Sequence, residues 1–140
     1  MMRQIDVIYC DDIREEVGNK VSYMGIYAGE LRVPAAPVIL GKLCIAVRIH
    51  APIAQPIESL EVRVVKERMG VEIGEVLATG VIEHPADFTV DEEASTKILT
   101  QLHFMLQPFQ IEDSFEIRVK AKTESEELVS GALRIRVDAK

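Results

Sequence analysis

The chain has 140 residues, 48% of them hydrophobic, which predicts a single globular domain over residues 1–140 and excludes bulk disorder. A net charge of −7 at pH 7 repels nucleic-acid phosphate, so a nucleic-acid partner is not expected. The apolar residues are rich in Val and Ile, and only 5% of the chain is aromatic, which favours strands over a helix bundle.

The chain opens with a pattern that predicts a strand. Ile5, Val7 and Tyr9 occupy every second position, the period of a strand with one buried face. Asp11 and Asp12 are expected to end this strand, because Asp disfavours strand interiors and hydrogen-bonds to the nearby backbone in turns.

A short charged link and a second strand follow. One short helical turn is possible near residues 12–17, and Gly18 with Asn19 supplies residues that tolerate a positive φ. A β-favouring run resumes at Val21. Gly25 interrupts that run, which predicts a bulge or a close approach of another chain segment to the backbone.

These opening residues also form an uncommon string. Cys-Asp-Asp-Ile-Arg at residues 10–14 is followed by Gly18 with Lys20 and by Met-Gly-Ile-Tyr at residues 24–27. The stretch resembles the opening of an uncharacterised family of short bacterial and bacteriophage-associated proteins of unassigned function. The resemblance implies a small β-rich domain and transfers no catalytic residue. The motif positions are Cys10, Asp11, Asp12, Arg14, Gly25 and Tyr27.

The middle of the chain alternates in the same way. Period-2 runs separated by turn residues predict further strands, and a long polar stretch predicts a surface loop in which Phe88 and Val90 act as inward anchors. The expected strands cover residues 43–49, 60–65, 71–79 and 98–107, with a turn at residues 67–70 and the loop at residues 83–95.

The last hairpin has the clearest pattern. A turn centred on Ser125 keeps every apolar residue of both strands on one face, whereas a slip of one residue would bury the charges. Val129 is expected on the buried face as well. The cross-strand pairs predicted by this register are Phe115 with Ile135, Ile117 with Leu133, and Glu116 with Arg134.

The number and spacing of these runs indicate the fold class. About eight or nine strands, with turn signals roughly every ten residues, are typical of an all-β protein. The pattern predicts a two-sheet antiparallel β-sandwich, immunoglobulin-like or Greek-key, rather than a barrel.

The acidic residues suggest one possible metal site. Calcium prefers several carboxylate and carbonyl oxygens, and the candidate ligands Asp11 and Asp12 lie near Glu15 and Glu16 in the sequence. No spacing matches a calcium loop, so we expect no metal and no other cofactor. A structural pairing of Asp11 or Asp12 with Arg14, Lys20 or an arginine of a strand is favoured. Loop carboxylates that would complete a site are those of Asp87, Asp91 and Asp113.

The sequence does not predict an enzyme. His50, His84 and His103 lack the spacing of a zinc site, and the serines lack the context of a nucleophile. The first residues lack the apolar core of a secretory signal, and no apolar run approaches the ~20 residues that span a membrane. We therefore expect a cytoplasmic protein without a membrane partner, in which Cys10 and Cys44 are free thiols.

One surface of the last hairpin is basic. This surface suits an acidic protein partner or the acidic end of a second copy, although such faces are often only solvated. The leading hypothesis is therefore a non-enzymatic module that acts by protein–protein contact or self-assembly, related to bacteriophages or prophages. The alternative is a sandwich that binds Ca²⁺ or a small ligand at the Asp11–Asp12 end. The basic residues are Arg118, Lys120, Lys122, Arg134 and Arg136.

Overall fold

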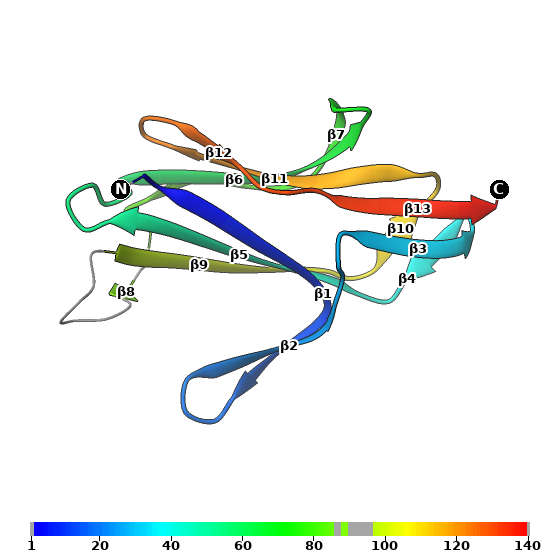
Figure 1. The fold of residues 1–140 in the computed structure, drawn as a ribbon, viewed down its shortest axis with the longest axis horizontal. Coiled ribbons are helices and arrows are strands. Elements are labelled where there is room, and N and C mark those ends of the chain that lie inside the picture. Colours follow the sequence, from blue (N-terminus) through cyan, green and yellow to red (C-terminus); the bar gives the residue numbers. More distant parts are fainter. Residues whose placement is uncertain (1, 86–87, 90–96, 140) are drawn as a thin grey trace.

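The computed structural model describes residues 2–85, 88–89 and 97–139, and these residues form strands and no helix (Figure 1). The strands outnumber the eight or nine expected, because several are too short for alternation to reveal. Their bounds are β1 Gln4–Glu16, β2 Lys20–Ile26, β3 Glu30–Ala35, β4 Val38–Leu40, β5 Leu43–Pro52, β6 Ser59–Arg68, β7 Val71–Glu83, β8 Phe88–Thr89, β9 Lys97–Leu106, β10 Phe109–Ile111, β11 Phe115–Thr123, β12 Glu127–Val129 and β13 Leu133–Ala139.

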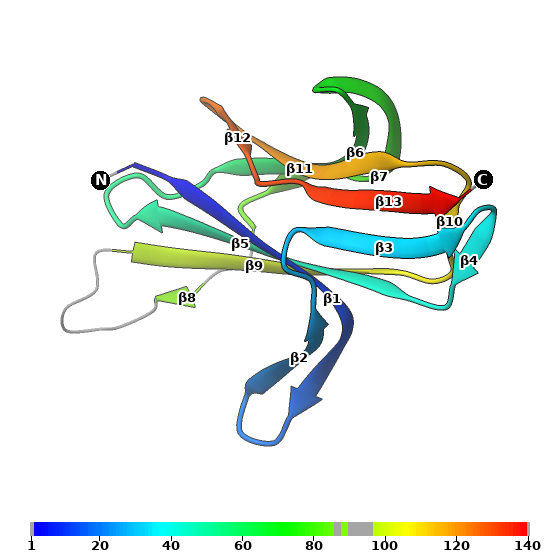
Figure 2. The ribbon, with the colours of Figure 1, turned by 45° about the vertical axis from the view of Figure 1, so that its right-hand side comes forward.

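Two sheets lie one above the other in both views of the ribbon (Figures 1 and 2). The first sheet has the strand order β2-β1-β5-β9-β8, and the second has the order β3-β13-β11-β6-β7, with β12 paired to β11. Strands β4 and β10 form a small separate pair. The prediction of an all-β sandwich is confirmed.

The core lies between the two sheets. It is made by the inward residues of β5, β6, β11 and β13, and burial of each such aliphatic side chain stabilises the fold by about 1.5–3 kcal/mol. Strand β5 is covered on both faces, since Cys44 and Ala46 on its outer side are buried as well. The largest fully buried side chains include Ile45, Ile49, Leu60, Ile117, Leu133 and Ile135.

The predicted register of the last hairpin is confirmed. The partners across β11 and β13 are Phe115 with Ile135, Glu116 with Arg134, and Ile117 with Leu133.

The expected burial of Val129 is wrong. The register of β11 with β12 pairs Lys120 with Val129, one residue out of step with the pairs nearer β13. Buried Ser130 causes this shift, because its backbone N–H donates to Val119 O and its Oγ accepts from Val119 N. Val129 consequently faces outward, and Leu128 packs against the core instead.

The predicted end of the first strand at Asp11 and Asp12 is also wrong. Strand β1 continues through both residues to Glu16, and residues 12–16 are strand where a helical turn was possible. The reason is a change of partner at Cys10, which pairs with Cys44 of β5 on one side and with Ile26 of β2 on the other. Long-range pairing thus overrides the local preference of Asp.

One pair of strands departs from the predicted antiparallel arrangement. Strand β3 runs parallel to β13, with Leu31 opposite Ile135 and Val33 opposite Val137. After β2 the chain leaves the first sheet and joins the edge of the second, where it meets β13 running in the same direction (Figure 2).

The expected loop at residues 83–95 is described only in part. Strand β7 extends to Glu83, beyond the predicted end at Thr79, and β8 occupies residues 88–89. The side chain of Phe88, and all of residues 86–87 and 90–96, lie outside the described part of the chain, so the anchoring by Phe88 and Val90 stays a prediction.

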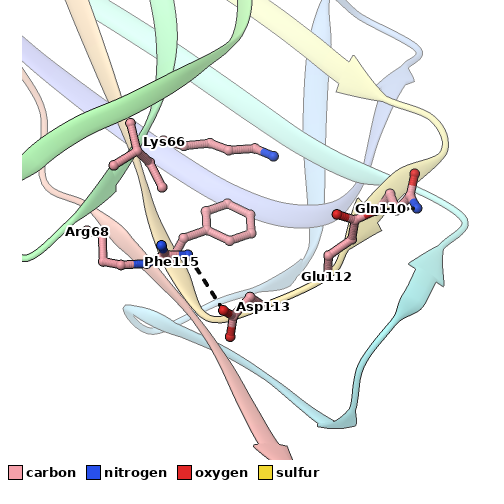
Figure 3. A pocket seen from close by; sticks show the side chains of 7 residues that line it. Lys66, Arg68, Gln110, Glu112, Asp113 and Phe115 are labelled. Carbon is pink, nitrogen blue, oxygen red and sulfur yellow. Dashed lines mark hydrogen bonds and ion pairs between the residues drawn. The ribbon is translucent and has the colours of Figure 1, made fainter. Parts of the chain in front are cut away.

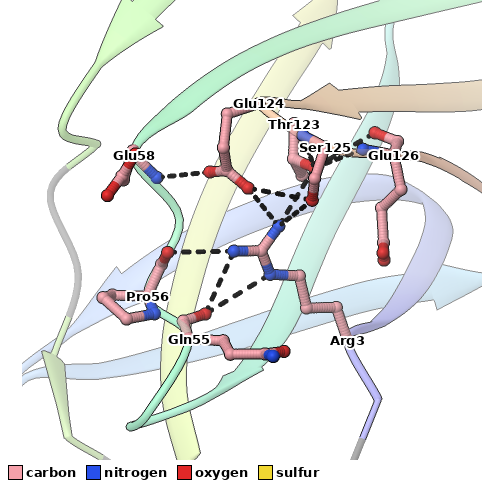
Figure 4. Close-up of polar contacts among 8 residues, drawn as sticks. All are labelled: Arg3, Gln55, Pro56, Glu58, Thr123, Glu124, Ser125 and Glu126. Atoms are coloured by element: carbon pink, nitrogen blue, oxygen red, sulfur yellow. Dashed lines mark hydrogen bonds and ion pairs between the residues drawn. The ribbon is translucent and has the colours of Figure 1, made fainter.

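Arg3 closes one end of the sandwich (Figure 4). Its guanidinium donates to the backbone oxygens of Gln55 and Pro56 and to the side chains of Thr123 and Glu124. The start of β1, the loop after β5 and the β11–β12 turn are therefore joined by a single side chain.

Candidate interaction site

The β1–β2 hairpin lies outside the body of the sandwich (Figures 1 and 2). Its two strands pair from Cys10 with Ile26 to Glu16 with Lys20. Most motif residues lie on these two strands, and Tyr27 directly follows β2. Asp11, Gly25 and Tyr27 meet at the base of the hairpin, whereas Arg14 lies nearer its turn.

Asp11 and Gly25 are packed tightly against each other at that base. A Cβ atom added at Gly25 would lie 2.3 Å from Asp11 Oδ2, and the φ angle of Gly25 is +68°, a conformation that other residues rarely adopt. The predicted close approach at Gly25 is confirmed. Asp11 Oδ1 also accepts a hydrogen bond from the Tyr27 hydroxyl, and burial together with this carboxylate raises the pKa of Tyr27 to about 12.

Asp12 takes a different set of partners. Lys42 Nζ donates to Asp12 Oδ1 over 2.9 Å, and Arg14 Nε lies 3.8 Å from Asp12 Oδ2. The hydrogen bond from Lys42 is the main cause that lowers the pKa of Asp12. The pairing with Arg14 was one of the structural roles expected, whereas Lys42 was missed because it lies 30 residues further along the sequence, directly before β5.

The two aspartates therefore do not converge on one point. The described residues contain no group of three or more His, Cys, Asp or Glu side chains placed to hold a metal ion. Of the other carboxylates considered, Asp113 lies 3.8 Å from Arg68 Nη2, whereas Asp87 and Asp91 lie outside the described residues.

Cys10 and Cys44 are buried free thiols on adjacent strands. Burial, together with the smaller effect of the neighbouring Cys44, raises the pKa of Cys10 to about 11. The adjacent aspartates act in the same direction but contribute less than burial. Both thiols therefore remain protonated at neutral pH, the state in which sulfur is a poor nucleophile.

Tyr23 ties the hairpin to the outer face of the first sheet. Its hydroxyl lies 3.2 Å from His103 Nε2 and accepts a hydrogen bond from Gln101 Nε2 over 3.0 Å. The Tyr23 and His103 rings also meet edge to face, with centroids 5.8 Å apart. Burial lowers the pKa of His103, whereas the charge of Glu15 raises it in part. His103 faces outward as predicted, but its contact with Tyr23 could not be foreseen from local spacing.

Apolar side chains remain exposed along this hairpin. The exposed fractions are 93% for Val17 at the turn, 43% for Met24 and 58% for Ile26. Exposed apolar side chains gathered on one projecting segment are typical of a contact surface.

The predicted basic face is interleaved with acids. Arg118 Nε donates to Glu67 Oε1 over 2.8 Å, and Lys120 Nζ lies 3.4 Å from Glu72 Oε1. Glu67 was expected in a turn, but it lies in β6 and is buried beneath these cations.

The remaining members of this face are also near acids. Arg136 Nη1 lies 3.7 Å from Glu30 Oε1, and Arg134 is opposite Glu116 on the neighbouring strand. Lys122 is opposite Glu61 of β6. The surface is thus a network of alternating charges rather than a free basic patch, which weakens its case as a site for an acidic partner.

A pocket of about 290 Å³ lies where β6 meets the segment between β10 and β11 (Figure 3). Lys66 Nζ is 4.9 Å from the centre of the Phe115 ring, and Arg68 is near Asp113 on the opposite wall. The charged side chains of Lys66, Arg68 and Asp113 in the lining are therefore already engaged with one another or with Phe115. The described lining of the pocket does not offer several unpaired polar groups that point toward one ligand.

The fold and the hairpin define the class of protein: an all-β sandwich that carries its distinctive residues on a projecting hairpin. The chain belongs to DUF6941, a family of unknown function whose sequence profile matches residues 6–136. Neither the curated proteins nor the solved structures contain a match to the chain. Within the described residues, no helix has the length and apolar character needed to cross a membrane.

Proposed function

We propose that this protein is a non-enzymatic β-sandwich module that acts by contact with another protein, or with a second copy of itself, through the β1–β2 hairpin. The observation that carries the proposal is the exposure of Val17, Met24 and Ile26 on that hairpin. Apolar side chains of this kind contribute most of their free energy when a partner removes them from water.

The contacts at the base of the hairpin support the proposal. Asp12 contacts Lys42, which directly precedes β5, and Tyr23 contacts His103 of β9, so both strands of the hairpin are fixed to the sandwich. A surface fixed before association loses less conformational entropy when a partner binds.

The chemistry of the thiols supports a non-enzymatic role. Cys10 has a pKa raised to about 11 and is buried, which keeps the sulfur protonated and away from a substrate. The free state of Cys10 and Cys44 also supports a reducing, cytoplasmic setting. A bacteriophage or prophage origin rests on the resemblance of the opening motif alone.

A photo-crosslinking experiment tests the proposal. The crosslinking residue p-benzoylphenylalanine is placed at Val17 of the hairpin in one variant and at Val81 of β7 in a matched control, since both positions are exposed. Each variant is expressed in the source cells and irradiated. We expect a discrete adduct, to another protein or to a second copy, from position 17 and none from position 81.

Two results would overturn the proposal. One is the absence of any adduct from position 17, and the other is the same adducts from both positions. Mass spectrometry of the adduct identifies whether the partner is a different protein or this one.

A further inference from the structure

We propose that β2 is the edge through which two copies of this chain pair, antiparallel across a two-fold axis, so that their first sheets join into one continuous sheet. This inference rests on the proposed function, because it names the partner of the same hairpin. The described residues end the two main sheets with β2, β8, β3 and β7. A further edge strand, β12, pairs with β11 off this order and has three residues, which makes it a short edge.

Three of these edges are poor partners for another strand. Strand β3 carries the charged Glu30 and Arg32 and then Pro34, which has no N–H to donate. Strand β7 pairs with β6 through three register shifts and carries Glu72 and Glu75. Strand β8 comprises two residues of the described part of the chain. Prolines, charges, bulges and short length are the usual devices that prevent edge-to-edge pairing.

Strand β2 lacks the prolines, the register shifts and the short length, and it carries little charge. It has seven residues, no proline, a single charge at Lys20, and an unshifted register with β1. Val21, Met24 and Ile26 are exposed along it. Among the strands that the structure describes, only β1 is hydrogen-bonded to β2, so alternate backbone N–H and C=O groups of β2 face away from the sheet and can form a ladder with another strand.

The sequence of β2 complements itself. A two-fold axis at Tyr23 pairs the whole strand with its copy, and Lys20 then lies opposite Ile26 of the second copy. No like charges face each other in this register, and Val21 lies opposite Gly25. Because the chain carries a net charge of −7, two copies repel each other over most of their surfaces, and this nearly uncharged strand is where they approach at least cost.

The pairing is expected to be weak. A ladder of two seven-residue strands buries less than the roughly 1,000 Å² of a stable interface, so the copies exchange between monomer and dimer as concentration changes. The full chain is therefore measured by sedimentation velocity over a concentration series that reaches the millimolar range.

Two substitutions at one position test the register as well as the edge. Ile26→Lys places a lysine opposite Lys20 of the second copy, and Ile26→Glu places a carboxylate there. Both changes remove the same apolar side chain from an exposed position, and a thermal melt verifies that each variant is folded. We expect the dissociation constant to rise at least tenfold for Ile26→Lys and to stay within threefold of the wild type for Ile26→Glu. Lys20→Glu added to Ile26→Lys is expected to restore the dimer.

The other outcomes overturn the inference. A wild-type chain that is monomeric throughout the series excludes the pairing, as does a dimer that both substitutions leave unchanged. If Ile26→Lys and Ile26→Glu weaken the dimer equally, Ile26 makes a hydrophobic contact but does not lie opposite Lys20 of the second copy. A monomeric wild type that still gives an adduct to a different protein from position 17 would refute the β2 dimer alone and leave the proposed function standing.

Discussion

Arg3 and Glu124 form an ion pair that joins the first residues of the chain to the turn between β11 and β12 (Figure 4). The side chain of Arg3 is only 7% exposed, and Glu124 Oε1 also accepts a hydrogen bond from the backbone N–H of Glu58. Because the pair is largely shielded and shares further partners, it is expected to stabilise the fold more than an ordinary surface ion pair.

Replacement of Arg3 tests this expectation. Arg3→Met leaves the carbonyl oxygens of Gln55 and Pro56 without their donor and leaves the Glu124 carboxylate without its cation, so we expect a loss of about 1–3 kcal/mol in the free energy of unfolding. Urea denaturation measures the change. The matched control is Arg32→Met, whose exposed pair with Asp138 is expected to contribute about 0–1 kcal/mol. An equal loss of unfolding free energy in Arg3→Met and Arg32→Met would contradict the expectation that Arg3 stabilises the fold more than an ordinary surface arginine.

The Glu124 carboxylate also predicts how the free energy of unfolding changes at acidic pH. Burial acts to raise the pKa of Glu124, but hydrogen bonds from Glu58 N–H and Arg3 outweigh it and lower the pKa from 4.5 to about 2. A carboxyl group with a lowered pKa in the folded protein contributes stability above its unfolded pKa, and this stability is lost as the pH falls through the folded pKa. We expect the difference between wild type and Glu124→Gln to be full above pH 4.5 and to shrink toward pH 2.

Unfolding free energies measured at intervals between pH 2 and pH 6 give this difference directly. Glu126→Gln is the matched control, because Glu126 lies in the same turn, is exposed and is not paired with Arg3. A constant difference between wild type and Glu124→Gln across the range would show that the pKa of Glu124 is unperturbed.

Gly25 gives a prediction that concerns the base of the hairpin. Gly25→Ala places a Cβ 2.3 Å from Asp11 Oδ2 at a φ of +68°, so we expect the free energy of unfolding to fall by about 1–3 kcal/mol. Gly41→Ala is the control, since no atom lies within 4 Å of its added Cβ. Thermal and urea melts compare the two, and a Gly25→Ala protein as stable as Gly41→Ala would exclude the tight contact.

What the sequence predicts well is the part of the fold set by local alternation. Phe115, Ile117, Leu133 and Ile135 reveal their face and their register because both strands alternate without interruption on either side of one turn. The register changes nearer the turn, where Ser130 takes the backbone groups of Val119, and no alternation signals a buried serine that bonds to the backbone.

The contacts of the candidate site depend on residues far apart in the chain. Asp11 and Asp12 look like the end of a strand in isolation, yet β1 changes its partner from β5 to β2 at Cys10, and pairing with β2 keeps the chain extended. Lys42, directly before β5, and His103 of β9 reach the hairpin, and their spacing from Asp12 and Tyr23 carries no local period. The motif marked the correct segment, whereas its partners are visible only in the folded chain.

The contact of Tyr23 with His103 predicts that the hairpin responds to pH. Gln101 Nε2 lies 2.9 Å from His103 Nε2, and since an amide nitrogen only donates, this contact requires a neutral imidazole that accepts at Nε2. Burial lowers the pKa of His103 below 6.5 and Glu15 opposes the shift in part. A histidine with a lowered pKa contributes stability above its unfolded pKa, and protonation at lower pH removes that contribution.

Hydrogen exchange of residues 20–26 measures this response. After correction for the intrinsic pH dependence of exchange, we expect these amides to open more often as the pH falls below 6.5, while those of β11 stay protected. His103→Gln cannot titrate and keeps a hydrogen-bonding side chain, so its exchange is expected to be independent of pH over the same range. Protection of residues 20–26 that is equal in the wild type at pH 7.5 and at pH 5 would show that His103 does not hold the hairpin.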